Sequence, residues 1–160
     1  MNIRTGTQSD LHVLEEMLFE AFFWKPTMQR PPLEDFKRNP EFRKLLSLWG
    51  KRPGDTAVIA ESQNTPIGAA WYRLWTDDNH SYGYVDSETP ELAIGVAANH
   101  RGKGVGRALL RALIEEGRQR GVETISLSVD NANFARRLYE QEGFQKVGAA
   151  GTSSTLLLRL

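Results

Sequence analysis

The sequence predicts an α/β fold, in which a mixed sheet carries helices on both of its faces. Segments with the apolar runs or the alternation of β-strands are interspersed with segments whose apolar residues recur every three or four positions. A chain of 160 residues suits one core, so we expect a single domain over residues 1–160. A glycine-rich turn also stands between an apolar run and an amphipathic segment, and this order of elements builds anion sites.

The first half of the chain is predicted to contain three strands and two helices. Ser9 or Asp10 can cap the first helix, whose apolar residues form one stripe that we expect to be buried. Pro40 is expected to interrupt the second helix, because proline lacks the backbone donor that a helix needs. A short turn at 64–66 predicts a hairpin. The expected elements are a strand at 2–5, helices at about 11–22 and 33–49, and strands at 56–60 and 67–75.

The second half of the chain alternates strands with two helices. The helix at about 105–120 is strongly amphipathic. A later helix carries Phe134, Leu138 and Tyr139 and ends at Gly143, which suits a helix C-terminus. The remaining expected elements are a polar loop at 76–90, a strand that begins at about residue 91, and three strands at 125–129, 144–148 and 154–160.

Composition narrows the classes of function. Twenty basic and twenty acidic residues cancel, whereas nucleic-acid-binding proteins usually carry a basic excess, so we expect no nucleic-acid partner. No segment approaches the roughly 20 apolar residues of a membrane span, and the N-terminus lacks the apolar stretch of a signal peptide. The absence of cysteine excludes disulfides and zinc–thiolate sites. We therefore expect a cytoplasmic protein with no membrane partner and no metal ion.

The glycine-rich turn follows the apolar run 92–98 and is the feature around which the chain is organised. Its residues are Arg101, Gly102, Lys103, Gly104, Val105, Gly106 and Arg107. The first N–H groups of the next helix lack partners within the helix, and the helix dipole adds about half a positive charge at that end. The glycines let an anion approach the backbone, and three cations add formal charge. We therefore predict a phosphate- or pyrophosphate-bearing ligand.

Two nucleotide-binding motifs do not match this turn. A P-loop requires G-x-x-x-x-G-K-[ST], but Lys103 lies between glycines and no Ser or Thr follows it to reach magnesium. A dinucleotide motif requires G-x-G-x-x-G, but Leu109 stands where the third glycine belongs, and the turn lies late in the chain. A glycine-rich surface turn without a ligand is the remaining alternative.

The segment 91–147 resembles the GNAT superfamily of N-acetyltransferases. The superfamily carries [RQ]-x-x-G-x-[GA] between a strand and a helix, and Arg101, Gly104 and Gly106 match this pattern. Further along, it carries a strand, a helix that begins at an asparagine, and the ending Leu-Tyr…Gly-Phe. Residues 133–144, NFARRLYEQEGF, match this second pattern. The two motifs in this order are specific, whereas the first 90 residues match only in outline.

The resemblance implies acetyl-CoA as the co-substrate and a mostly antiparallel sheet whose two central parallel strands splay apart. It implies that the amides of the glycine-rich turn bind the pyrophosphate. It also implies that the pantetheine arm lies in the gap and pairs with main-chain groups of Ile94, Gly95 and Val96. A glycine within a strand marks either such a close approach or a bulge.

The resemblance further places Asn133 and Arg136 at the cofactor. Asn131 is the alternative to Asn133, because the spacing from the tyrosine varies between family members. Either asparagine can instead serve only as a helix cap.

In this family an amine attacks the thioester carbonyl directly, and the CoA thiolate leaves. Tyr139 resembles the general acid that protonates the thiolate, and the alternative is a core tyrosine on an amphipathic helix. Glu91 stands at the start of the strand before the turn, where several members place a glutamate, and we expect it to be the base. Glu88 and a water chain are the other candidates for that role.

The acceptor is expected to be a primary amine of a small molecule, a peptide N-terminus or a lysine. Between Leu74 and His100 the chain has acidic residues but no Lys or Arg. This composition fits either an acidic rim that attracts a cationic amine or a solvated polar loop. Residues 22–36 would form the opposite wall or a hydrophobic flap, and 37–52 a solvated basic helix face. A non-catalytic acyl-CoA-binding or sensing module is the alternative function, and a homodimer is compatible with the family.

Overall fold

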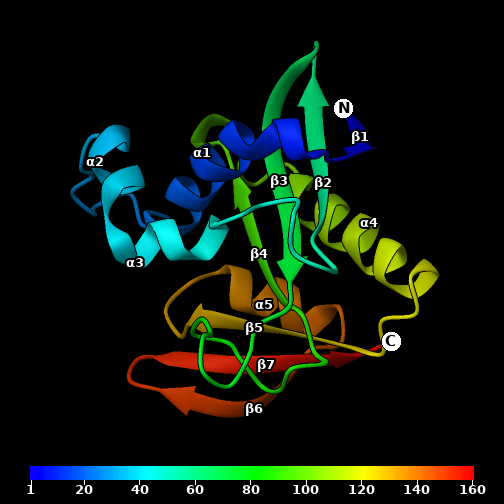
Figure 1. Cartoon of the computed structure of the whole chain (residues 1–160). Helices are drawn as coiled ribbons and strands as arrows, with labels where there is room; N and C mark the ends of the chain where they lie inside the picture. Colours follow the sequence, from blue (N-terminus) through cyan, green and yellow to red (C-terminus); the bar gives the residue numbers. More distant parts are fainter.

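The computed structural model describes residues 1–160, which form a seven-stranded sheet with helices on both faces (Figure 1). The strands are β1 (Asn2–Thr5), β2 (Thr56–Ser62), β3 (Thr65–Arg73), β4 (Glu91–Val96), β5 (Thr124–Asp130), β6 (Gln145–Ala150) and β7 (Ser153–Arg159). The helices are α1 (Leu11–Phe22), α2 (Leu33–Arg38), α3 (Pro40–Arg43), α4 (Val105–Gln119) and α5 (Ala135–Gln141). Three short 3₁₀ turns are η1 (Gln8–Asp10), η2 (Lys44–Leu46) and η3 (Ala98–His100). None of these helices combines the length and apolar character needed to span a bilayer.

The strands are ordered β1-β2-β3-β4-β5-β7-β6, and every neighbouring pair is antiparallel except β4 and β5. β4 pairs with β3 from Glu91 to Val96, but it pairs with β5 only where Glu91 lies opposite Ser126. Beyond that residue the two strands diverge, and Figure 1 shows β5, β7 and β6 running across the direction of β1 to β4. The predicted mixed sheet with two splayed parallel strands is therefore confirmed.

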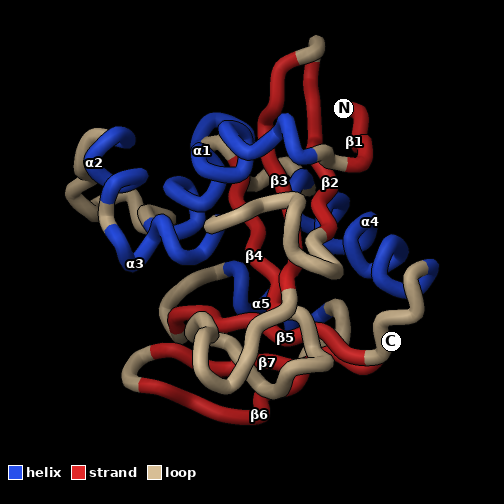
Figure 2. The backbone as a smooth tube through the Cα atoms, viewed as in Figure 1, coloured by secondary structure: helices blue, strands red, loops and turns tan.

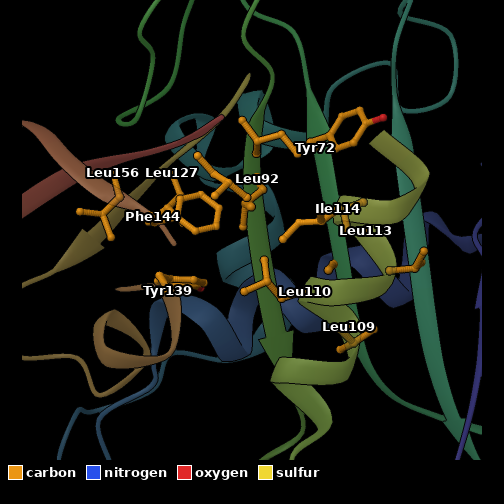
Figure 3. Packing of buried hydrophobic residues seen from close by; sticks show 14 of the residues in the cluster. Tyr72, Leu92, Leu109, Leu110, Leu113, Ile114, Leu127, Tyr139, Phe144 and Leu156 are labelled. Atoms are coloured by element: carbon orange, nitrogen blue, oxygen red, sulfur yellow. The ribbon is translucent and has the colours of Figure 1, made fainter. Parts of the chain in front are cut away.

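Two hydrophobic clusters cover the two faces of the sheet. Alternate residues of β3 and β4 face opposite sides, so Trp71 belongs to one cluster whereas Tyr72 and Leu92 belong to the other. The first cluster packs α1, α2 and η2 against the sheet, and the second packs α4 and α5 (Figure 3). Members of the second cluster include Leu109, Leu110, Leu113, Leu127, Tyr139, Phe144 and Leu156.

Helix α1 packs so closely on β4 that the strand needs a glycine at one point. A Cβ atom built on Gly95 would lie 1.9 Å from the carbonyl oxygen of Met17 and 2.6 Å from the Met17 carbonyl carbon. Gly95 is thus neither at a bulge in the β3–β4 register nor explained only by a ligand, because the backbone of α1 already occupies the space of its side chain.

The start of α1 differs from the prediction, because Asp10 does not cap it. The Asp10 carboxylate accepts the Thr7 N–H at 2.8 Å and pairs with Arg4 at 2.8 Å, and the Arg4 guanidinium lowers the pKa of Asp10 to about 2. The 3₁₀ turn η1 runs directly into the helix, so this carboxylate fastens the turn and β1 instead. Ser9 does not cap the helix either, since its hydroxyl faces that of Thr7.

The second predicted helix is broken as expected at Pro40 but is shorter than predicted. Asn39 is extended, as the residue before a proline prefers to be, and its side-chain oxygen caps α3 by accepting the Glu41 N–H at 3.0 Å. Helical structure ends at Leu46, so Trp49 reaches the core from a turn rather than from a helix.

The predicted hairpin is confirmed, but its turn lies earlier. Gln63 and Asn64 both have positive φ, 52° and 64°, which is the geometry of a two-residue hairpin turn. Pro66 therefore lies within β3 rather than in the turn, and β3 ends at Arg73.

A buried ion pair fastens the segment after α3 to the end of β3. Arg73 and Asp55 each expose only 2% of the side chain and form a two-pronged pair, with distances of 3.0 and 2.9 Å. Arg73 also donates to the Leu45 carbonyl at 3.0 Å. Because the two charges are paired away from solvent, removing one partner would leave the other charge buried and unpaired.

We expect Gly95→Ala to destabilise the protein by about 3 kcal/mol, because α1 would have to move away from β4 to admit the methyl group. Chemical denaturation monitored by circular dichroism measures this change. Gly148→Ala in β6 is the matched control, since the nearest atom to a Cβ there lies 3.8 Å away. Equal stabilities of the two variants would contradict the close approach of α1.

Candidate active site

The splayed strands leave one edge of β4 without a strand partner. The last contact of the parallel pair is the Ser126 N–H, which donates to the Pro90 carbonyl at 3.0 Å. From Leu92 to Val96 the edge of β4 that faces β5 has no registered partner. Backbone groups on such an edge can pair with an extended ligand, as in strand addition. Ile94, Gly95 and Val96 belong to this stretch of β4.

The glycine-rich turn lies at the N-terminus of α4, beyond the end of β4. Gly102 and Gly104 have positive φ, 74° and 84°, and a Cβ on either would meet no atom within 4 Å. Ala108 is the first residue of α4 whose N–H reaches back to the turn, bonding to the Gly104 carbonyl at 3.1 Å. The N–H groups at Val105, Gly106 and Arg107 are therefore free, and the space over the turn is open.

The cations of the turn contribute less free charge than the sequence suggested. The Arg101 guanidinium donates to the Val96, Trp24 and Glu20 carbonyls at 3.0–3.1 Å and pairs with the Glu20 carboxylate at 2.8 Å. Its side chain thus fastens the end of α1 to the end of β4.

The other two cations of the turn differ from each other. Arg107 pairs with Glu142 at 2.7 Å and with the Gln141 side chain at 2.6 Å, which ties α4 to α5. Lys103 makes no ion pair, and its residue is exposed. An anion at this turn would therefore meet mainly backbone N–H groups and the helix dipole, with Lys103 as the unpaired cation.

The two asparagines near α5 are used in different ways. Asn133 accepts the Ala135 N–H at 2.9 Å through its side-chain oxygen, so it caps the start of α5. Asn131 accepts the Ser154 hydroxyl at 2.6 Å and also contacts Arg136, which ties both side chains to β7. Phe134 does not belong to the buried face of the helix, since it is 89% exposed.

Tyr139 lies on α5 at the margin of the second hydrophobic cluster. Only 7% of the residue is exposed, and its ring meets Phe144 edge to face with centroids 5.8 Å apart (Figure 3). Its hydroxyl makes no hydrogen bond to protein, and burial raises the pKa of Tyr139 well above its usual value. The phenol is therefore protonated at neutral pH and has an unused donor.

Glu91 is the most strongly perturbed carboxyl group of the site. Burial raises the pKa of Glu91 to about 7, although the Gly83 N–H, which donates to Oε2 at 2.9 Å, acts in the opposite direction. Oε1 is buried and has no hydrogen-bond partner. A carboxyl group that titrates near neutrality with one free oxygen can take up or release a proton at physiological pH.

Glu91 and Tyr139 lie on opposite faces of the sheet, at the point where the strands part. Leu92 shares a hydrophobic cluster with Tyr139, and successive residues of a strand point to opposite sides. The Glu91 side chain accordingly contacts the loop that covers the other face. The gap between β4 and β5 is thus flanked by a proton donor on one face and a titratable carboxyl group on the other.

The loop between β3 and β4 covers Glu91 and part of β5. Figure 2 shows this long loop lying in front of β5 and β7, and the Ser126 hydroxyl donates to the Gly83 carbonyl at 2.7 Å. Lys44 donates to the His80 carbonyl at 2.7 Å, so one basic side chain of the segment 37–52 holds the acidic loop instead of facing only solvent. Gly83 was not singled out from the sequence, because only the tertiary contact explains it.

Glu88 lies away from Glu91, in a polar hollow at the C-terminal end of α4. The hollow has a volume of about 590 Å³ and is bounded by Tyr72, Arg120, Glu123 and Thr124 among others. The aromatic residues near the end of α1 form a compact group in which Phe22 and Phe36 each contact Phe42, at 4.5 and 4.3 Å between centroids. They pack as a hydrophobic layer, and Tyr82 of the long loop rests on Phe22.

Comparisons with known proteins identify relatives of the chain in sequence and in fold. The acetyltransferase (GNAT) family matches residues 14–144. A mycothiol acetyltransferase of Propionibacterium freudenreichii is 36% identical over 139 residues, which are 86% of this chain but 41% of that protein. The chain therefore spans about two fifths of the length of that relative.

Two solved structures resemble the whole chain in fold. The PaiA N-acetyltransferase of Thermoplasma acidophilum in complex with coenzyme A superposes with a TM-score of 0.70 at 17% identity and covers 100% of both chains. A ribosomal-protein-alanine N-acetyltransferase of Brucella melitensis gives 0.67 at 24% identity, again over 100% of both chains.

We expect Glu91→Gln to change the pH dependence of stability. A carboxyl group with a pKa of about 7 when folded and about 4.5 when unfolded stabilises the fold below pH 4.5 and loses that contribution as pH rises through 7. The glutamine variant lacks this loss, so relative to the wild type it should gain up to about 3 kcal/mol between pH 4 and pH 8. Urea denaturation at several pH values measures the difference, and parallel curves would contradict a raised pKa.

Proposed function

Because the chain belongs to the acetyltransferase (GNAT) family, we propose that it transfers an acetyl group from acetyl-CoA to a primary amine. The observation that carries this proposal is the splay of β4 and β5, with a titratable carboxyl group and an unpaired phenol on opposite faces of the gap. An unpaired strand edge offers backbone donors and acceptors to an extended partner, so this edge suits an extended ligand.

The donor would occupy the gap and the glycine-rich turn. Main-chain groups of Ile94, Gly95 and Val96 would pair with the pantetheine arm, and the residues from Arg101 to Arg107 would hold the pyrophosphate through their N–H groups. The open space over Gly102 and Gly104 and the free first turn of α4 support this placement. Asn133 and Arg136 would border the donor, with their present hydrogen bonds fixing α5 beside it.

The donor supplies an activated acyl group, a thioester whose carbonyl carbon an amine can attack. Glu91, in its ionised form, would accept the proton that the amine must lose, directly or through water. Tyr139 would donate its phenolic proton to the departing sulfur, since a phenol is protonated at neutral pH. Proton uptake and proton release would thus be assigned to different faces of the sheet.

The acceptor would enter on the face covered by α1, α3 and the β3–β4 loop, where Glu91 lies. Acidic residues of this loop, among them Asp77 and Asp78, would attract a cationic amine. The similar proteins include a mycothiol acetyltransferase and a ribosomal-protein-alanine N-acetyltransferase. Both a small-molecule amine and a peptide N-terminus therefore belong in the first panel of acceptors.

Ligand-dependent thermal stability tests the donor part of the proposal. Acetyl-CoA and CoA at about 100 times their dissociation constants should stabilise the protein by roughly 2.7 kcal/mol, whereas ATP and NAD should not. A panel of amines, assayed by release of the CoA thiol, then tests transfer. Binding of acetyl-CoA without thiol release for any amine would favour an acyl-CoA sensor, and stabilisation by ATP or NAD alone would refute the donor.

We expect Tyr139→Phe to lower the turnover number by about tenfold to a thousandfold, because the sulfur would leave without an adjacent acid. Binding of acetyl-CoA should remain unchanged, since the ring and its contact with Phe144 are retained. Steady-state kinetics and the acetyl-CoA thermal shift measure the two effects separately. Tyr72→Phe is the control, because Tyr72 is the other buried tyrosine of the second cluster and its hydroxyl also lacks a partner. A Tyr139→Phe enzyme with normal turnover would remove Tyr139 from the mechanism.

A further inference from the structure

Glu91 is held by a chain of two hydrogen bonds that ends on a buried serine of the neighbouring strand. The Ser126 hydroxyl donates to the Gly83 carbonyl at 2.7 Å, and the Gly83 N–H donates to Oε2 of Glu91 at 2.9 Å. Ser126 is completely buried and lies opposite Glu91 in the one registered pair of β4 and β5. The two hydrogen bonds and the β4–β5 register pair thus link Glu91, Gly83 and Ser126 in a closed loop of contacts at the point where the strands diverge.

We propose that Gly83 and Ser126 are positioning residues that orient the Glu91 carboxylate and shield it from bulk water. The consequence for catalysis rests on the proposed role of Glu91 as the base, whereas the effect on the carboxylate itself does not. Neither residue would touch the reacting atoms, because both act through Glu91.

Gly83 is a glycine for reasons of space rather than of backbone conformation. It is not among the residues with positive φ, so any side chain could adopt its backbone angles. A Cβ atom there would lie 2.6 Å from the carbonyl carbon of Leu127, 2.7 Å from the Ser128 nitrogen and 3.0 Å from Oε2 of Glu91. The backbone of the loop is therefore pressed against β5 and the carboxylate together.

The loop affects the Glu91 carboxylate in two opposite ways. By excluding water it favours the protonated form, and by donating the Gly83 N–H it favours the ionised form. Ser81, His80 and Lys44 also face this carboxylate and favour its ionised form, but more weakly than the Gly83 N–H does.

The rest of the loop is anchored independently of Ser126. Lys44 donates to the His80 carbonyl, and the Tyr82 hydroxyl donates to Glu41 while its ring rests on Phe22. Removing the Ser126 hydroxyl should therefore leave the loop in place and the site dry, but with a less well directed Gly83 N–H.

These contacts predict shifts of opposite sign for two small substitutions. Ser126→Ala weakens the donor without admitting water, so the titration midpoint of Glu91 should rise by about 0.5–1 pH unit. Gly83→Ala forces the loop away from β5 and lets water reach the carboxylate, so the midpoint should fall towards the ordinary value of about 4.5. A residue that merely supports the fold would not produce opposite shifts.

Carbon-13 NMR titration of glutamate side-chain carboxyl groups measures these midpoints, with the Glu91 signal identified by its loss in Glu91→Gln. Ser128→Ala is the matched control, because Ser128 lies two residues along the same strand and its hydroxyl makes no hydrogen bond; it should leave the midpoint unchanged. If Gly83→Ala does not fold, Tyr82→Ala loosens the loop without a clash and should also lower the midpoint.

Opposite shifts support the proposal, and shifts of the same sign, or none, overturn it. The acidic limb of the pH–rate profile, measured on the same variants, tests separately whether Glu91 is the base of the proposed reaction. If the titration midpoint moves and the acidic limb does not, Gly83 and Ser126 position Glu91 as proposed, and only the assignment of Glu91 as the base is refuted.

Discussion

β4 is hydrogen-bonded to β3 along its whole length, yet it pairs with β5 at a single residue. Helices pack on both faces of β4, and α1 approaches so closely that Gly95 must lack a side chain, so the strand cannot rotate to follow β5. β5 is meanwhile paired along seven residues with β7, whose partner is β6. Each strand is therefore fixed by its other neighbour, and the unpaired edge between them is a consequence of packing rather than a local defect. The unpaired edge of β4 and the separation of Tyr139 from Glu91 both depend on that divergence.

The elements could be predicted from the sequence because their signals are local. The stripe of α4, the alternation of β5 and the positions of Pro40 and Gly143 each act within a few residues, and each corresponds to a feature of the structure. The errors concern contacts between distant segments. Asp10 has the right residue type for a cap but meets Arg4, and Phe134 has the right spacing for a core position but lies outside the packed face. The spacing of residues along the sequence does not predict which distant residue a side chain will contact in the fold.

The glycine-rich turn illustrates how charge counted in a sequence differs from charge available in a fold. Arg101 shares the Glu20 carboxylate with Arg30, and Arg107 shares the Glu142 carboxylate with Arg111, so both guanidinium groups are held in ion pairs within the protein. They join the turn to α1 and α5, and the groups of the turn that stay without a partner are the first backbone N–H groups of α4 and the Lys103 ammonium. Such N–H groups are fixed by the helix and need no reorganisation when a ligand arrives, whereas a free arginine would have to be ordered. Although the sequence of this motif is rich in basic residues, its unpaired donors are mainly backbone N–H groups.

The fold also changes the charge state of Glu91 from the one that its residue type alone would predict. A glutamate at the surface would be ionised at neutral pH and would be a weak base, whereas a glutamate sealed in an apolar core would hold its proton. Here the β3–β4 loop removes water, and a single backbone N–H restores part of the lost stabilisation, which leaves the pKa near 7. Burial alone would raise the pKa further, and the N–H alone would lower it. Gly83 contributes to both effects, because its N–H donates to the carboxylate and its lack of a side chain lets the loop approach β5 closely.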